Sequence, residues 1–219
     1  MDPVLNRLRR ISLVCAGLAA VVIALAWGGL TQPLDGWAIL GLRGWADRWT
    51  PMLADAMRAL SWMGNAWPRS LIALAFILFL LVRKLQRAAS YILYTALGIA
   101  ALNSWVLKAL VTRARPDIVP RLVDVDTSWS LPSGHAANSA AVYGAMALVA
   151  TVIWWRRRQR RTIWAVAGLL VFGIGLSRVW LGVHWPSDVF AGWAVGLMWL
   201  AILAWFMPPA DSSGDRQRV

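Results

Sequence analysis

The sequence predicts an all-α integral membrane protein with six transmembrane helices and short interfacial amphipathic helices between the first and second spans. Of its 219 residues, 59% are hydrophobic, and the mean hydropathy is +0.58. A typical soluble domain is only about 45–50% apolar. The net charge of +12 does not indicate a nucleic-acid-binding protein. Most arginines stand in short clusters between apolar runs, where membrane topology accounts for them. We expect one membrane-embedded domain over residues 1–219.

The first predicted span is residues 11–30, which carry no charge over 20 positions. That length is sufficient to cross the hydrocarbon core. A basic start followed by an apolar run also fits a signal peptide, but this run is long for one and has no clear cleavage site. We therefore expect a retained span.

The segment that follows is mixed in character. Residues 31–67 alternate apolar and charged side chains, which predicts two amphipathic helices lying at the interface, separated by Pro51. The apolar run 70–82 is too short to span alone. We expect the second span to include residues 59–68, with Arg69 reaching towards the lipid headgroups.

Four further apolar runs complete the predicted bundle. They are separated by basic or polar segments, of which residues 156–161 form a dense basic loop. Residues 208–219 form a polar tail that we expect to be disordered. The predicted spans are residues 88–107, 133–155, 162–176 and 189–207.

An even number of spans places both ends of the chain on the same side of the membrane. The ends and the loops on that side hold 13 of the 22 lysines and arginines, which predicts that this side is cytoplasmic. Three polar clusters then fall together on the opposite face. The 13 residues are Arg7, Arg9, Arg10, Arg83, Lys84, Arg87, Arg156, Arg157, Arg158, Arg160, Arg161, Arg216 and Arg218.

The first of these clusters lies between Lys108 and Pro116. Lys108 and Arg115 are seven residues apart, about two helical turns, and would share one face of a continuing helix. They could bind an anion together or simply snorkel from a helix end, and the cluster alone does not decide between these. Arg113 lies off that face, and we interpret it as a lipid headgroup contact.

The second cluster is Pro132-Ser133-Gly134-His135, directly before an apolar run. Proline and serine here are helix-start signals. With Ser133 as N-cap, the first backbone amides would form an anion site, and Gly134 would allow a phosphate to approach the backbone closely. An ordinary cap beside an interfacial histidine is the alternative.

The third cluster runs from Ser177 to Asp188. Pro186 suits the first position of the last helix, which places His184 just before that helix and Asp188 in its first turn. Asp188 can then contact one imidazole nitrogen and leave the other free to attack. Arg178 could donate two hydrogen bonds to a phosphate.

Together, the three clusters resemble the signature motifs of the type 2 phosphatidic acid phosphatase superfamily, in order and in spacing. The motifs cover residues 108–188. The six-span layout also resembles that of bacterial members that act on undecaprenyl diphosphate or phosphatidylglycerophosphate.

The resemblance implies a lipid phosphatase, a hydrolase of phosphoric monoesters or acid anhydrides, which works without a metal or other cofactor through a phosphohistidine. His184 would be the nucleophile, Asp188 would orient it, and His135 would protonate the leaving oxygen and then activate water. The phosphoryl oxygens would be held by Lys108, Arg115, Ser133, Gly134 and Arg178. The role of Ser177 stays open.

The expected partners are a lipid phosphate and the bilayer, and the expected location is the bacterial inner membrane with the site on the extracytoplasmic face. A phosphotransferase with an acceptor other than water fits the same residues. A transporter or receptor for an anionic lipid is a third reading, which would not need the two histidines and Asp188. The loop carrying Asp117, Asp124 and Asp126 either shapes the substrate entrance or is simply solvated.

Overall fold

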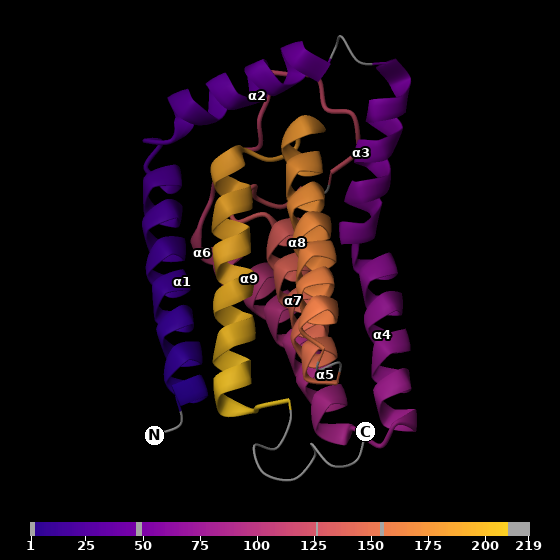
Figure 1. The fold of residues 1–219 in the computed structure, drawn as a ribbon. Helices are drawn as coiled ribbons and strands as arrows, with labels where there is room; N and C mark the ends of the chain where they lie inside the picture. Colours follow the sequence, from indigo (N-terminus) through magenta and orange to yellow (C-terminus); the bar gives the residue numbers. More distant parts are fainter. Residues whose placement is uncertain (1–2, 47–49, 126, 154–155, 210–219) are drawn as a thin grey trace.

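The computed structural model describes residues 3–46, 50–125, 127–153 and 156–209, and these ranges contain helices and loops but no strand. Most of the helices run along one axis, and α2 crosses one end of the bundle (Figure 1). The helices are α1 (Pro3–Trp27), α2 (Gln32–Ala46), α3 (Thr50–Gly64), α4 (Ala66–Val82), α5 (Gln86–Ala101), the π-helix η1 (Leu102–Leu107), α6 (Lys108–Leu110), α7 (Gly134–Ile153), α8 (Arg157–Trp180) and α9 (Pro186–Phe206).

Helix α7 forms the centre of the bundle and packs against α5, α8 and α9. Its closest approach is to α9, at two glycines. A Cβ added to Gly192 would lie 2.6 Å from the carbonyl oxygen of Ser133, and one added to Gly196 would lie 2.3 Å from that of Ala137. Glycine at these positions lets two backbones touch, which brings the first turns of α7 and α9 side by side.

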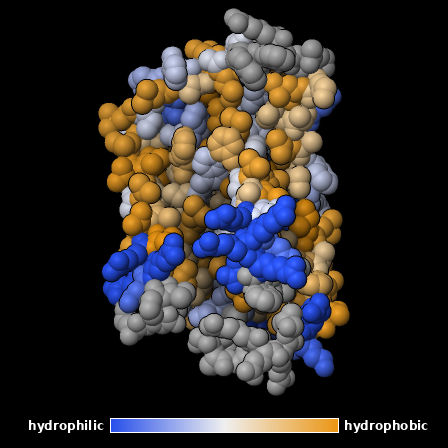
Figure 2. Space-filling model, in the orientation of Figure 1, coloured by the Kyte–Doolittle hydropathy of each residue, from blue (hydrophilic) through white to orange (hydrophobic). Residues whose placement is uncertain are grey.

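The expectation of a helical membrane protein is confirmed. Four described helices are long and apolar enough to cross a membrane, namely residues 6–27, 86–110, 157–180 and 186–206. The bent pair Met52–Gly64 and Ala66–Val82 makes a fifth if it counts as one span. Large hydrophobic side chains are exposed along the bundle, and Figure 2 shows a hydrophobic flank with a strongly hydrophilic patch in its lower half.

The segment between the first and second spans differs from the prediction in part. Helix α2 lies across the bundle end, whereas α3 runs down beside α8 and continues into α4 after a 57° bend (Figure 1). Pro51 is the second residue of α3, so the boundary between α2 and α3 lies next to this proline, as predicted. Arg69 does not reach towards headgroups, because its Nη1 donates to the Gly64 carbonyl at the bend over 2.7 Å.

The later elements follow the predicted runs, but their ends move. The basic residues from Arg157 onward are the first turns of α8 and not a loop. The run that begins near residue 88 ends in the π-helix η1, directly before Lys108. The predicted disordered tail lies almost entirely outside the described residues, which end at residue 209.

Candidate active site

A cavity of about 370 Å³ brings the three polar clusters together. Six of the predicted site residues line it: Lys108, Arg115, Gly134, His135, Arg178 and His184. The remaining walls come from α3, from the α3–α4 bend and from the loop before α7: Arg58, Ser61, Trp62, Asn65, Val123, Asp124 and Val125. The predicted convergence of the motifs is therefore present, and four positive side chains face one space.

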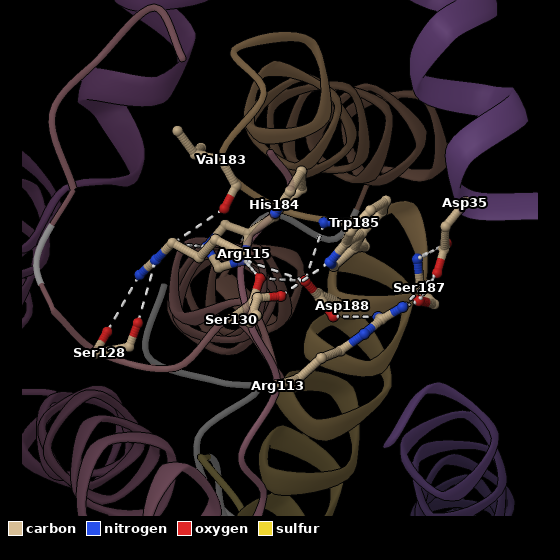
Figure 3. A network of polar contacts seen from close by, with 12 residues as sticks. Asp35, Arg113, Arg115, Ser128, Ser130, Val183, His184, Trp185, Ser187 and Asp188 are labelled. Carbon is tan, nitrogen blue, oxygen red and sulfur yellow. Dashed lines mark hydrogen bonds and ion pairs between the residues drawn. The ribbon is translucent and has the colours of Figure 1, made fainter. Parts of the chain in front are cut away.

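His184 lies in the turn between α8 and α9 and is only 2% exposed. Its Nε2 is 3.3 Å from Nη1 of Arg115. A guanidinium can only donate, so Nε2 accepts and carries no proton. The proton therefore sits on Nδ1, which is 3.2 Å from the Ser130 hydroxyl (Figure 3). This tautomer leaves Nε2 as the nitrogen with a lone pair beside the cavity.

Asp188 supports His184 partly through Ser130. The carboxylate Oδ2 is 3.6 Å from His184 Nδ1, and it accepts a short hydrogen bond from the Ser130 hydroxyl. The Ser130 oxygen can accept from Nδ1–H while its own proton goes to Asp188. The direct contact expected from the spacing is therefore supplemented by a serine that the sequence did not single out.

Burial lowers the pKa of His184 to about 4. The hydrogen bond and charge of Asp188 oppose this shift, whereas the nearby charges of Arg178 and Arg115 add to it. His184 is therefore neutral at physiological pH, which is the form in which an imidazole can attack phosphorus.

Asp188 is held by the start of its own helix. Helix α9 begins at Pro186, as predicted, and the Trp185 backbone N–H donates to Asp188 Oδ2 over 3.0 Å. The other oxygen, Oδ1, accepts from Arg113 Nη1 over 2.7 Å. The carboxylate is fully buried and has partners on both oxygens.

Arg113 is the largest departure from the sequence interpretation. Its side chain is 9% exposed and not a headgroup contact, because it bridges Asp188 and Asp35. Nη2 donates to Asp35 Oδ2 over 2.8 Å, and the guanidinium stacks 5.3 Å from the Trp185 ring (Figure 3). The buried arginine gives each of the two carboxylates an ionic partner.

Asp35 connects α2 to this site. It is 3% exposed and accepts from the Ser187 backbone N–H over 2.9 Å and from the Ser187 hydroxyl over 2.6 Å. The Thr31 hydroxyl donates to it over 2.7 Å. We call the set Thr31, Asp35, Arg113, Ser187 and Asp188 the buried aspartate network.

Lys108 and Arg115 meet in the cavity, but not on one helical face. Helix α6 ends at Leu110, and Arg115 lies in the loop that follows. A residue before proline disfavours the helical conformation, and Pro116 follows Arg115. The two cations converge on Ser128 instead, whose hydroxyl accepts from Lys108 Nζ over 2.6 Å and from Arg115 Nη2 over 3.2 Å.

The second motif begins α7 as expected, since the helix starts at Gly134. The hydroxyl of Ser133, however, is fully buried and has no hydrogen-bond partner among the described residues. Ser133 thus takes the predicted N-cap position, but its hydroxyl makes no capping bond. His135 faces the α3–α4 bend, where its Nε2 lies 2.7 Å from Asn65 Oδ1.

The remaining predicted residues differ in whether they line the cavity. Arg178 lines the cavity and donates to the Ser61 hydroxyl over 2.6 Å. Ser177 is turned into the helix and donates to the Ile174 carbonyl. In the loop, Asp124 lines the cavity and Asp117 is exposed, whereas Asp126 lies outside the described residues. No three His, Cys, Asp or Glu side chains gather as a metal site within the described ranges.

A family model described as the PAP2 superfamily matches residues 87–211, which is more than half of the chain and includes all three motifs. The chain belongs to the PAP2 superfamily. Its fold also matches the crystal structure of a transmembrane PAP2-type phosphatidylglycerolphosphate phosphatase from Bacillus subtilis, with a TM-score of 0.83 over 93% of this chain and 98% of that one, at 23% identity.

Two curated relatives extend this comparison. Phosphatidylglycerophosphatase B of Bacillus subtilis is 35% identical over 102 residues, which cover 46% of this chain and 49% of that protein. Undecaprenyl-diphosphatase of Sulfolobus acidocaldarius is 32% identical over 129 residues, which cover 57% and 58%. The chain thus spans about half of the length of these relatives.

Sequence reasoning missed the residues that hold the motif side chains in place. Ser130 lies two positions before the second motif and Arg113 lies inside the first, yet neither belongs to a local pattern that distinguishes a buried partner from a surface polar residue. Asp35 and Asn65 come from α2 and from the α3–α4 bend, far away in the chain. Only the folded arrangement brings them to the site.

Proposed function

We propose that this protein is a metal-independent lipid phosphatase that works through a phosphohistidine on His184. The observation that carries the proposal is a neutral, buried imidazole whose Nε2 faces a cavity lined by Lys108, Arg115 and Arg178. Phosphoryl transfer needs positive charge around the equatorial oxygens and an in-line nucleophile. The three cations and the imidazole that line this cavity support the proposal on both counts.

In the first step, Nε2 of His184 attacks the terminal phosphorus atom and the bond from phosphorus to the leaving oxygen breaks. That oxygen is the lipid alkoxide oxygen in a monophosphate and the bridging oxygen in a diphosphate. The leaving oxygen takes a proton from His135, which must be protonated at this stage. The lysine and the two arginines hold the phosphoryl oxygens together with the Gly134 amide at the start of α7. Asp188, through Ser130 and its own charge, stabilises the positive imidazole of the phosphohistidine.

In the second step, His135 takes a proton from water as that water attacks the phosphohistidine. The bond from phosphorus to Nε2 breaks, inorganic phosphate leaves, and His184 returns to its neutral form. His135 is then protonated again and ready for the next lipid. One histidine must therefore be neutral while the other is protonated, which predicts a bell-shaped dependence of the rate on pH.

The proposed substrates are lipid monophosphates or diphosphates, with undecaprenyl diphosphate and phosphatidylglycerophosphate as the first candidates. The names of the two curated relatives support this range. A lipid substrate also suits a bundle with a hydrophobic flank (Figure 2), because its chains can stay in the bilayer while its headgroup enters the cavity.

We further propose six crossings, in which α3 with α4 counts as one and α7 as another. The start of α1 and the end of α9 lie at the same end of the bundle, and the turn between α8 and α9 lies at the other (Figure 1). The basic clusters at residues 83–87 and 156–161 support a cytoplasmic position for the first end. The cavity would then open on the extracytoplasmic face of the inner membrane.

The test is phosphate release in detergent with EDTA present, from undecaprenyl diphosphate, phosphatidylglycerophosphate and phosphatidic acid, for wild type and His184→Ala. We expect release that persists in EDTA, vanishes in the variant and passes through an acid-labile phosphoenzyme. Release that requires a divalent metal would contradict the mechanism. A phosphorylated acceptor in place of free phosphate would identify a phosphotransferase.

A further inference from the structure

The bend between α3 and α4 touches two of the motif residues. It is formed by Gly64 and Asn65, which lie outside the three motifs and outside the matched segment 87–211. From the turn before it, Ser61 accepts a hydrogen bond from Arg178. From the bend itself, Asn65 contacts His135. The bend is thus part of the wall of the cavity and not merely a connection between helices.

The position of the His135 ring depends on a glycine in this bend. A Cβ added to Gly64 would come within 2.9 Å of His135 Cδ2 and within 2.6 Å of Ile174 Cγ2. The ring therefore packs directly on the backbone of the bend. The bend is fixed from the other side by Arg69, which donates to the Gly64 carbonyl, and by Tyr143, whose hydroxyl donates to the Met63 carbonyl over 2.7 Å.

The contact between Asn65 and His135 defines the tautomer. Asn65 Oδ1 is 2.7 Å from His135 Nε2, and an amide oxygen can only accept. Nε2 must therefore carry a hydrogen in this arrangement. The edge of the ring that contains Cδ2 and Nε2 is turned towards the bend, so Nδ1 lies on the opposite edge and is the nitrogen whose proton can change.

We propose that Asn65 is a positioning residue for His135, holding its Nε2–H so that Nδ1 gives the proton to the leaving oxygen and later takes one from water. This inference rests on the proposed function and adds a residue to it that none of the motifs contains. The charged and titratable groups that act on His135 are Arg178, His184, Arg69 and Lys108. Among these cations, the Asn65 oxygen presents the negative end of a dipole to the imidazolium.

The test compares two substrates that differ in their need for an acid. The lipid is phosphatidylglycerophosphate, a phosphomonoester whose alkoxide leaving group must be protonated, whereas p-nitrophenyl phosphate releases a stable anion. In single-turnover experiments, we expect Asn65→Ala to slow formation of the phosphohistidine about 10- to 100-fold with the lipid, within the range that general acid catalysis contributes. With p-nitrophenyl phosphate, we expect less than about a threefold change in that step.

Asn65→Asp supplies a second readout. The carboxylate keeps the acceptor and adds a negative charge beside the imidazolium, so it should restore much of the lipid rate and move the alkaline limb of the pH profile upward by about one unit. A role limited to folding would not shift that limb. Ser70→Ala, an exposed position in α4, is the matched control and should behave as wild type with both substrates.

The possible results distinguish the role of Asn65 from the phosphatase activity. Equal losses with both substrates, or a lipid rate unchanged in Asn65→Ala, would overturn the role of Asn65 and leave the phosphatase proposal intact. Wild-type protein that forms no phosphohistidine with either substrate would overturn both. If Asn65→Ala does not elute as folded protein in detergent, the pH profile of Asn65→Asp decides alone, and an unshifted alkaline limb would reject the inference.

Discussion

The two histidines of this site stand in different kinds of surroundings. His184 lies in a closed set of contacts, with Ser130 and Asp188 on one nitrogen and Arg115 on the other. His135 sits at the first turn of α7, and its ring contacts a helix bend that carries Asn65. A nucleophile must hold one geometry for in-line attack, whereas an acid that becomes a base must change its protonation twice. The network around His184 and the neutral amide contact of His135 fit these two tasks.

The largest effect is expected at Asp188. In Asp188→Asn the charge that stabilises the imidazolium of the phosphohistidine is lost, and the amide can present a hydrogen to Ser130 where an acceptor is required. We expect the rate of phosphohistidine formation to fall by roughly 10³- to 10⁴-fold, as for the loss of charge in other oriented histidine pairs. Rapid-quench measurement of the phosphoenzyme checks this, and a loss below about tenfold would contradict the supporting role.

The second test removes the arginine between the two buried carboxylates. Arg113→Met leaves Asp35 and Asp188 without their shared cation, which should reduce the free energy of unfolding by about 3–5 kcal/mol. The matched control is Arg58→Met, because Arg58 pairs with Asp55 at the surface, with side chains 48% and 75% exposed. That pair should contribute at most about 1 kcal/mol.

Thermal unfolding in detergent gives the Tm of both variants. Similar shifts in Tm for Arg113→Met and Arg58→Met would show that the buried aspartate network does not stabilise the site. Adding Asp35→Asn to Arg113→Met should recover part of the loss, because it removes one of the two uncompensated charges.

On the side of His135, the sharpest probe is the glycine of the bend. Gly64→Ala places a methyl group against His135 Cδ2 and Ile174 Cγ2, and we expect a loss of about 1–3 kcal/mol from overpacking together with a displaced ring. Gly168→Ala in α8 is the control, since a Cβ there meets nothing within 4 Å. It should leave stability unchanged or raise it by up to about 1 kcal/mol. Equal Tm values for the two variants would exclude tight packing at the bend.

A smaller effect is expected at Ser130, which bridges His184 and Asp188. Ser130→Ala removes the bridge but leaves Asp188 bonded to Arg113 and to the Trp185 backbone. The rate should therefore fall only about tenfold, the equivalent of one hydrogen bond. Ser177→Ala, another fully buried serine, should leave the rate as it is, and equal losses in both would point to packing alone.

The mildest probe is titration. Because the chain has two histidines, His135→Gln leaves a single imidazole whose ¹⁵N signals report His184. With a pKa lowered to about 4, the signals should stay those of the neutral ring from pH 8 down to about 5. The unfolded histidine takes up its proton near about pH 6.5, whereas the folded one stays neutral to about 4. The free energy of unfolding therefore decreases as the pH falls from about 6.5 towards 4. A midpoint near 6.5 would contradict the buried setting.

The sequence is sufficient to predict most of the helices and six of the residues that line the cavity. The second and third motifs contain residues that start a helix, at Gly134 and at Pro186, next to side chains that can bind phosphate. Apolar runs predicted the helices because membrane spans depend mainly on local composition. These features need no knowledge of distant contacts.

The supporting residues could not be found in this way. Arg113 looks like any interfacial arginine until Asp35, 78 positions away, is placed against it. The spacing of Lys108 and Arg115 predicts one helical face, because seven residues fit two turns. The helix ends at Leu110, however, and the two side chains meet at Ser128. Contacts between residues that lie far apart in the chain leave no repeating pattern in a single sequence.

The π-helix η1 accommodates an extra residue of chain next to the site. It is wound with i→i+5 hydrogen bonds, so each turn holds more residues than an α-helical turn, and it ends directly before Lys108. The six residues of η1 turn about as far around the axis as five residues of α-helix would. Lys108 therefore keeps the angular position that a regular helix shorter by one residue would give it. The same six residues wound as α-helix would turn Lys108 by roughly 100°, so the direction of this cation depends on the winding of the segment as well as on its sequence.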